Sequence, residues 1–203
     1  MTALLNPLAA GPLVLVAAVG EAEGSWGAAA ALACAGAEAD SAPLLIDVGG
    51  RTPRPTLIAS AAAQKLESRL KAQLPDAKAA ARGQVCHLAV PAEPDGLSRG
   101  ASAADTAREG GVVLHVPPQL LHPVLADFES RVSAVLLRAD LRADRALVAL
   151  TVRDLIERGV AAAVLKRRLT WVAERRAMFG VLPPGATGTL PERLVRQLTE
   201  VSR

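Results

Sequence analysis

Apolar runs of strand length alternate along the 203-residue chain with stretches of helical character. Most of these runs are continuously apolar, as expected of parallel strands that are buried on both faces. The alternation predicts an α/β fold with a single doubly wound, mostly parallel sheet and helices on both of its faces. The predicted strands are Leu13–Val19, Pro43–Val48, Val85–Val90, Gly111–Val116, Ala134–Arg138, Ala161–Leu165 and Met178–Leu182.

The intervening stretches predict the helices. The clearest one follows Asp140, because apolar residues recur there at helical spacing and Gly159 comes after the last turn. The stretch from Pro91 to Gly100, rich in Pro, Gly and Ser, is typical of a linker. Without an internal repeat, residues 1–203 are expected to form one domain. The predicted helices are Ser25–Ala39, Ile58–Leu74, Ala101–Glu109, Leu120–Glu129, Arg142–Arg158, Leu169–Arg176 and Pro191–Val201.

A Gly-rich turn, Gly20–Gly27, lies between the first predicted strand and the first predicted helix and reads Gly-Glu-Ala-Glu-Gly-Ser-Trp-Gly. This context is typical of a loop that holds phosphate on backbone N–H groups at a helix N-terminus. A working loop has Lys where Trp26 stands and Ser or Thr where Gly27 stands. Glu21 and Glu23 would instead repel phosphate. The organisation predicts a nucleotide-binding fold, whereas the residues argue against nucleotide chemistry.

Composition and charge narrow the partners. Aromatic residues make up 2% of the chain and Tyr is absent, so few rings could stack on bases, which counts against single-stranded nucleic acid. The net charge of +3 is uneven: residues 1–130 hold 9 Lys/Arg and 13 Asp/Glu, and residues 131–203 hold 14 and 7. The basic C-terminal third could face an acidic partner, an anionic lipid surface or nucleic acid, or could form solvated helix faces.

The two cysteines, Cys34 and Cys86, provide neither a metal site nor a disulfide framework and are expected to be buried thiols in a reducing cytosol. Cys86 and His87 are adjacent in a predicted strand, so their side chains should point to opposite faces and make a poor nucleophile–base pair. The N-terminus lacks the basic start of a signal peptide, and no apolar stretch is long enough to span a bilayer. A cytoplasmic location is expected.

The order of these motifs resembles the MinD/ParA family of deviant-Walker P-loop ATPases over nearly the whole chain. The matches are the strand, loop and helix of Leu13–Ala39, the strand ending in Asp47, the turn at His87–Ala92, the Walker B-like Val112–Pro118 and the strand at Ala163–Arg167. Within the family, the chain is most similar to the TadZ/CpaE type that accompanies pilus and flagellar machinery. The resemblance implies a P-loop fold and homodimers that meet face to face around the nucleotide.

The departures from the family pattern fall on its working residues. The signature lysine falls at Glu21, the Walker lysine at Trp26, the Mg²⁺-binding hydroxyl at Gly27, the Walker B aspartate at His115 and the base-reading Asn at Lys166. A site without these groups lacks charge neutralisation for phosphate and an anchor for Mg²⁺. We therefore expect no catalytic residue, no metal and no cofactor. A vestigial site is expected to remain at Gly20, Glu21, Gly24, Ser25, Trp26, Gly27, Asp47, His115 and Lys166.

Three residues of this vestigial site allow two readings each. Asp47 could hold a Mg²⁺-bound or attacking water, or could be satisfied by backbone N–H groups at the end of its strand. His115 could be a general base, or a polar strand-end residue with a hydrogen-bond partner. Trp26 could fill the vacant nucleotide pocket or anchor a partner, because a buried Trp contributes a large contact area.

The densest basic patch could meet phosphates or acidic lipid, or could be solvated surface. The last predicted helix, Pro191–Val201, could touch a membrane or pack on the sheet. The patch residues, which are also candidate partner contacts together with Trp26, are Lys166, Arg167, Arg168, Arg175 and Arg176.

The sequence thus favours a non-hydrolysing, homodimeric scaffold in the cytoplasm. The basic C-terminal third could add a weak contact with the inner face of the membrane. The scaffold would help to localise or assemble a cell-surface machine such as a Tad-type or type IV pilus, and its partners would be cytoplasmic components of a pilus or secretion machine. One alternative is an ATPase whose degenerate loop still binds Mg–ATP. Another is a ParA-like DNA-binding partition module, although nucleic acid is the less favoured partner.

Overall fold

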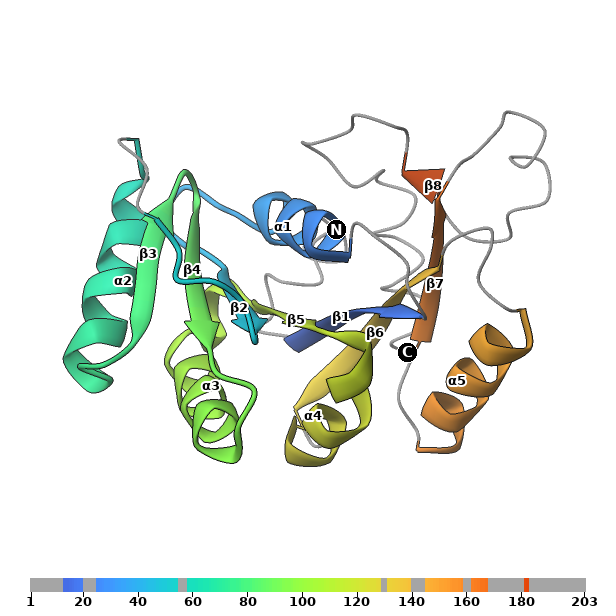
Figure 1. The fold of residues 1–203 in the computed structure, drawn as a ribbon. Helices are drawn as coiled ribbons and strands as arrows, with labels where there is room; N and C mark the ends of the chain where they lie inside the picture. The colour runs from blue at the N-terminus through green and yellow to red at the C-terminus, as the bar shows by residue number, and fades with distance from the viewer. Residues whose placement is uncertain are drawn as a thin grey trace.

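The computed structural model describes residues 13–19, 25–54, 58–128, 131–139, 145–158, 162–167 and 181–182. Its strands form an eight-stranded sheet in the order β3-β4-β2-β5-β1-β6-β7-β8 (Figure 1). Every neighbouring pair is parallel except β3 with β4. The predicted single, mostly parallel sheet is confirmed. The strands are β1 (Leu13–Val19), β2 (Leu44–Val48), β3 (Lys78–Arg82), β4 (Val85–Val90), β5 (Val112–Val116), β6 (Val132–Ala139), β7 (Ala162–Arg167) and β8 (Val181–Leu182).

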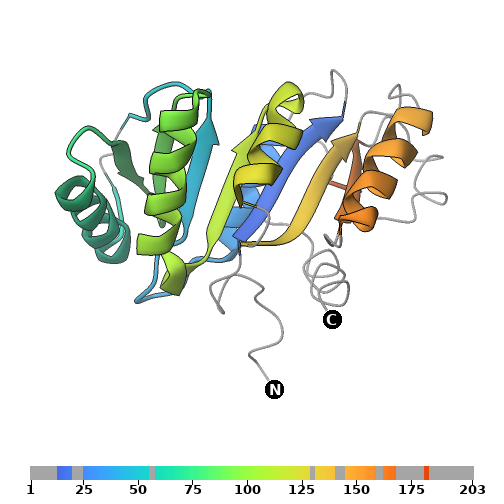
Figure 2. The same ribbon diagram turned by 90° about the horizontal axis from the view of Figure 1, so that it is seen from below.

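Helices cover both faces of this sheet, as predicted. In Figure 1, α1 lies above the sheet, and α3, α4 and α5 lie below it. Figure 2 shows these three helices side by side across their face, with α2 beside the edge formed by β3 and β4. The helices are α1 (Ser25–Ala35), α2 (Ala61–Gln73), α3 (Pro94–Thr106), α4 (Leu121–Phe128) and α5 (Arg145–Glu157). No helix among the described residues combines the length and the apolar character needed to cross a membrane.

The hydrophobic core has two layers, one on each face, because successive side chains of a strand point to opposite sides. Every residue of β1 is buried, which explains its uninterrupted apolar run. The layer under α1 consists largely of small side chains, so this helix can approach the sheet closely. The opposite layer contains the larger side chains, including Leu44, Ile46, Leu114 and Phe128.

The linker predicted from Pro91 to Gly100 is wrong, because α3 begins at Pro94. Proline is tolerated in the first helical turn, where its missing N–H has no intrahelical acceptor. A Cβ at Gly100 would contact Phe128, Val90 and Ile46 at 3.7–3.8 Å. The small residues of this stretch therefore serve close packing of a helix on the sheet.

The sequence also gave no signal for β3. This strand reads Lys-Ala-Ala-Ala-Arg, which has low β-propensity, and it pairs antiparallel with β4 through a turn at Gly83, whose φ is +60°. The first helix ends at Ala35, just before Gly36, and so stops short of the predicted Ala39. The predicted helices Leu169–Arg176 and Pro191–Val201 lie outside the described residues.

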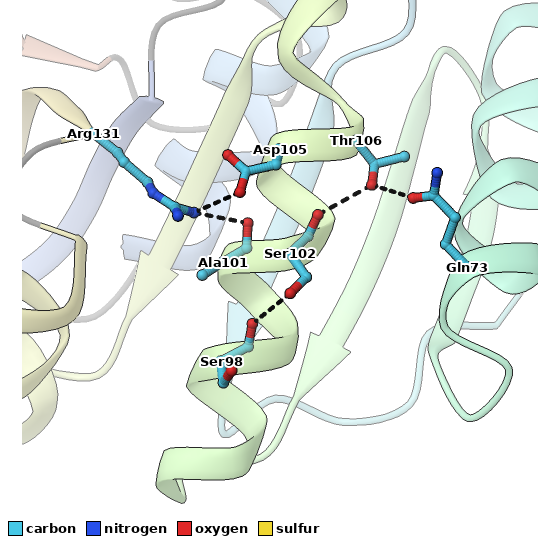
Figure 3. A network of polar contacts seen from close by, with 7 residues as sticks. All are labelled: Gln73, Ser98, Ala101, Ser102, Asp105, Thr106 and Arg131. Atoms are coloured by element: carbon cyan, nitrogen blue, oxygen red, sulfur yellow. Dashed lines mark hydrogen bonds and ion pairs between the residues drawn. The ribbon is translucent and has the colours of Figure 1, made fainter.

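Polar contacts tie α3 to its neighbours (Figure 3). The Thr106 hydroxyl donates to the Gln73 side chain of α2. Nη1 of Arg131, just before β6, donates to the carbonyl of Ala101 at 3.0 Å and pairs with Asp105 at 3.1 Å. These contacts link α3 to α2 on one side and to the start of β6 on the other.

Candidate functional site

Two polar residues become neighbours through the pairing of β2 with β5. Asp47 and His115 are register partners in these parallel strands, and each precedes the last residue of its strand. Register partners point to the same face of a sheet, here the face that α1 covers. Nδ1 of His115 lies 2.7 Å from Oδ1 of Asp47. The carboxyl edge of the sheet therefore carries a directly hydrogen-bonded Asp–His pair.

Ser25 extends this pair. It is the first residue of α1, and β1, the strand that precedes it in the chain, lies directly beside β5. The Ser25 hydroxyl lies 3.0 Å from Nε2 of His115. Hydrogen bonds thus connect Ser25, His115 and Asp47, which come from three elements far apart in the sequence.

His87 lies on the other side of Asp47. It is the register partner of Leu45, two residues before Asp47, and so faces α1 as well. His87 is 4% exposed, and its Nε2 lies 3.8 Å from Oδ2 of Asp47. Within the described part of the chain, neither of its ring nitrogens has a hydrogen-bond partner. The ring of Trp26 lies 6.0 Å from that of His87, tilted by 56°.

The protonation of the network follows from Asp47. Burial by itself would raise the pKa of Asp47, but the hydrogen bond from His115 and the electrostatic attraction of the His115 and His87 rings outweigh it and lower that pKa to about 2. An ionised carboxylate can only accept hydrogen bonds, so Nδ1 of His115 must donate. In a neutral imidazole, Nε2 is then an acceptor, and the Ser25 hydroxyl donates to it.

The turn after β2 holds the Asp47 carboxylate in place. Gly49 has a φ of +70°, a conformation that favours glycine. A Cβ at Gly50 would lie 2.1 Å from Oδ2 of Asp47, so only glycine leaves room for the carboxylate. The two glycines thus allow the chain to fold back over Asp47.

The structure brings together only some of the residues that the sequence singled out. Ser25, Trp26, Asp47 and His115 form one cluster, and Gly27 lies in the first turn of α1. His87 was missed, because the sequence argument considered it only as a partner for Cys86. His87 lies two residues before Ala89, and the register of β4 with β2 pairs Ala89 with Asp47. This register, which brings His87 close to Asp47, is seen only in the structure. Gly20, Glu21 and Gly24 lie outside the described residues.

The basic patch is described only in part. Lys166 and Arg167 are the last two residues of β7, which is separated from β1 by β6. This strand position places them away from the Asp47–His115 pair, which lies on the other side of β1. Arg168, Arg175 and Arg176 fall outside the described residues.

Other expectations are corrected. Among the described residues, the Asp47 carboxylate lies against two histidines, and no backbone N–H group donates to it. Cys34 is exposed rather than buried, whereas Cys86 is buried and its pKa rises to about 12 through desolvation. Cys86 lies in the core layer opposite α1, so it does face away from His87. In the described part of the chain, no group of three or more His, Cys, Asp and Glu side chains could hold a metal ion.

The low pKa of Asp47 predicts an acid-sensitive contribution to stability. Because the pKa falls from 3.8 to about 2 on folding, the contribution is complete above pH 4 and is lost as the pH falls through 2. Its size is about 1–2 kcal/mol after allowance for solvent screening. The difference in free energy of unfolding between wild type and Asp47→Asn should narrow by this amount between pH 5 and pH 2 in urea titrations. A difference that does not change with pH would contradict it.

Comparisons with known proteins identify the fold. No protein-family model and no curated protein matches the chain. Among solved structures, it is similar to the MinC:MinD cell division protein complex of Aquifex aeolicus, with a TM-score of 0.50, 13% identity and coverage of 93% of this chain and 78% of that one. The ParA family ATPase of Chlorobium tepidum TLS gives a TM-score of 0.54 at 12% identity, covering 94% and 82%.

The kinase domain of the Escherichia coli tyrosine kinase ETK is also similar, with a TM-score of 0.51, 18% identity and coverage of 82% of this chain and 68% of that one. Together these similarities show an α/β fold of the kind found in the MinD and ParA P-loop NTPases. Identities this low identify the fold alone.

Proposed function

We propose that this chain is a MinD/ParA-fold protein that does not hydrolyse ATP and acts through protein contacts, as a scaffold or localisation factor. The observation that carries this proposal is the hydrogen-bonded chain of Ser25, His115 and Asp47. By the resemblance, His115 stands at the Walker B aspartate. Mg²⁺ prefers oxygen ligands, and the imidazole donates to the Asp47 carboxylate. The acid that could help to hold a metal is therefore engaged with a histidine.

Trp26 supports a role in protein contacts. It stands at the position of the Walker lysine in the resemblance, and its side chain cannot neutralise phosphate. It is 40% exposed beside the site, at the edge where the resemblance places the homodimer contact. Exposed Trp is enriched in the centres of protein interfaces because its burial releases much apolar surface. A second copy of this chain is therefore the proposed first partner.

The finer identity rests on the resemblance to TadZ/CpaE-type proteins. It makes the chain a cytoplasmic component that helps to place or assemble a pilus or secretion machine. The MinD neighbour was solved in a complex with MinC, which agrees with a fold that presents a surface to other proteins. Contact with anionic lipid through the basic C-terminal third would add to this role.

Isothermal titration with Mg–ATP tests the proposal. We expect no binding heat at nucleotide concentrations up to about 1 mM, no phosphate release, and a sedimentation mass that nucleotide does not change. The matched control is a chain carrying Trp26→Lys, Gly27→Thr and His115→Asp, which restores three functional groups and should gain affinity if their loss explains the inactivity. Micromolar, Mg²⁺-dependent affinity of the wild type would overturn the proposal in favour of an ATPase.

A further inference from the structure

The site that lacks ATPase groups has the composition of a different catalytic device. We propose that Ser25 is a nucleophile for acyl transfer from carboxylic esters, with His115 as its general base and Asp47 as the residue that orients the imidazole. This goes beyond the proposed scaffold role, because it concerns a reaction that uses neither nucleotide nor metal. The two proposals can fail independently.

The geometry of the three side chains suits a serine nucleophile. A serine nucleophile needs its hydroxyl within about 2.6–3.2 Å of a base, and the base needs a third group to fix its orientation. The distance from Ser25 Oγ to His115 Nε2 is 3.0 Å, and that from His115 Nδ1 to Asp47 Oδ1 is 2.7 Å. Each ring nitrogen therefore meets the partner that its role requires.

The protonation of Asp47 and His115 suits the same role. Asp47 is 7% exposed and ionised, so it holds the imidazole in the form with a proton on Nδ1. Nε2 is left free to take the serine proton. The same carboxylate would stabilise the imidazolium that forms when His115 accepts that proton.

His87 supports the position of the Asp47 carboxylate. Its imidazole is buried, and within the described residues neither of its nitrogens has a hydrogen-bond partner. Burying such a polar ring without a hydrogen bond costs stability, so a core position alone does not explain it. Its Nε2 lies 3.8 Å from Oδ2 of Asp47, on the side away from His115. His87 is thus a positioning residue that limits the directions in which the carboxylate can turn.

The surroundings of Ser25 suit the charge that the reaction develops. Ser25 opens α1, an 11-residue helix, and the N–H groups of a first helical turn have no intrahelical acceptors. These groups and the helix dipole favour negative charge close to the serine. They would stabilise the oxyanion of a tetrahedral intermediate.

Ester hydrolysis at Ser25 needs no reactant other than the ester and water. The Ser25 oxygen attacks the ester carbonyl carbon while its proton passes to Nε2 of His115. The tetrahedral intermediate collapses, the C–O bond to the alcohol breaks, and the leaving alkoxide takes the proton from His115. Water then attacks the acyl-serine by the same route, which releases a carboxylic acid and restores Ser25. The net reaction is an ester plus water giving an acid plus an alcohol.

A fluorophosphonate probe tests the proposal, because it modifies activated serines and leaves ordinary ones unchanged. Intact-mass and peptide mass spectrometry should locate one adduct on Ser25 of the folded chain. Ser25→Ala should abolish the adduct, and Asp47→Asn should slow its formation at least about 100-fold. Ser102→Ala is the matched control: Ser102 lies on α3, its hydroxyl donates to the Ser98 carbonyl, and labelling should not change.

Labelling in urea, an ester burst assay and thermal melts complete the test. Wild type in urea should lose the labelling, and p-nitrophenyl acetate should give a burst of nitrophenol equal to the concentration of Ser25. Thermal melts establish that each variant folds, and Ser25→Ala is expected to fold because alanine is a good helix former. Labelling of Ser25 no faster than that of Ser102 would overturn the proposal. So would an unchanged rate in a folded Asp47→Asn protein.

Discussion

Replacement of Phe128 by alanine is expected to lower the free energy of unfolding by about 3–5 kcal/mol. Phe128 is 1% exposed and ends α4. Its ring tip lies against Gly100 of α3, where a Cβ would be 3.7 Å away, so it packs beneath the sheet between two helices. Aromatic residues make up only 2% of the chain, and few side chains are large enough to fill the cavity that the ring would leave. Urea denaturation measures the effect.

Two variants show whether the loss comes from the cavity. Phe128→Leu keeps most of the volume and should cost about 1–2 kcal/mol. Leu150→Ala, at a side chain that is 63% exposed on α5, should change stability by less than about 0.5 kcal/mol. If Phe128→Ala costs no more than Leu150→Ala, the contact between α3 and α4 does not contribute to the core as described.

The strands were the most predictable part of the fold. The bounds of β1 and β4 agree with the sequence prediction to the residue, because runs buried on both faces have sharp ends. The edge strand β3 and the start of α3 were missed for one reason: tertiary packing overrides local propensity in both. An alanine run pairs with β4 at the sheet edge, and a helix with Gly96 and Gly100 fits closely onto the sheet.

The candidate site was predictable only in its parts. The Gly-rich turn pointed to the loop before Ser25, and the family resemblance pointed to Asp47 and His115. Their contact depends on β5 lying between β2 and β1, and on the register that pairs Asp47 with His115. A shift of one residue would turn one of the two side chains to the other face. Sequence periodicity does not specify that register.

The sequence predicts that the Walker groups are lost at these positions, but it does not show what the residues that stand there form together. Taken alone, each replacement at a Walker position is a missing charge or a missing metal ligand. In the structure, His115 is hydrogen-bonded both to Asp47 and to Ser25. Residues that look vestigial one at a time form a connected polar network, and buried networks of this kind are costly unless their members are satisfied.

Gly50→Ala should disrupt this network, although it replaces none of the side chains that form it. The added Cβ would lie 2.1 Å from Oδ2 and 2.2 Å from Cγ of Asp47, so the carboxylate must move. Its movement would break the hydrogen bond from His115 and leave a displaced charge in a buried position. We expect the free energy of unfolding to fall by about 2–4 kcal/mol. Chemical denaturation at pH 7 measures this loss.

Gly27→Ala is the matched control for Gly50→Ala, because a Cβ at Gly27 meets no atom of the described residues within 4 Å. Gly27 lies in the first turn of α1, so alanine there should leave stability unchanged or raise it by up to about 1 kcal/mol. The substitution at Gly50 also tests the link to chemistry: Gly50→Ala should slow the labelling of Ser25, whereas Leu150→Ala on α5 should not. A Gly50→Ala protein that unfolds like wild type would mean that Asp47 can turn away from His115 at no cost. The carboxylate would then not be held by its neighbours, and neither the stability of this edge nor the reactivity of Ser25 could depend on it.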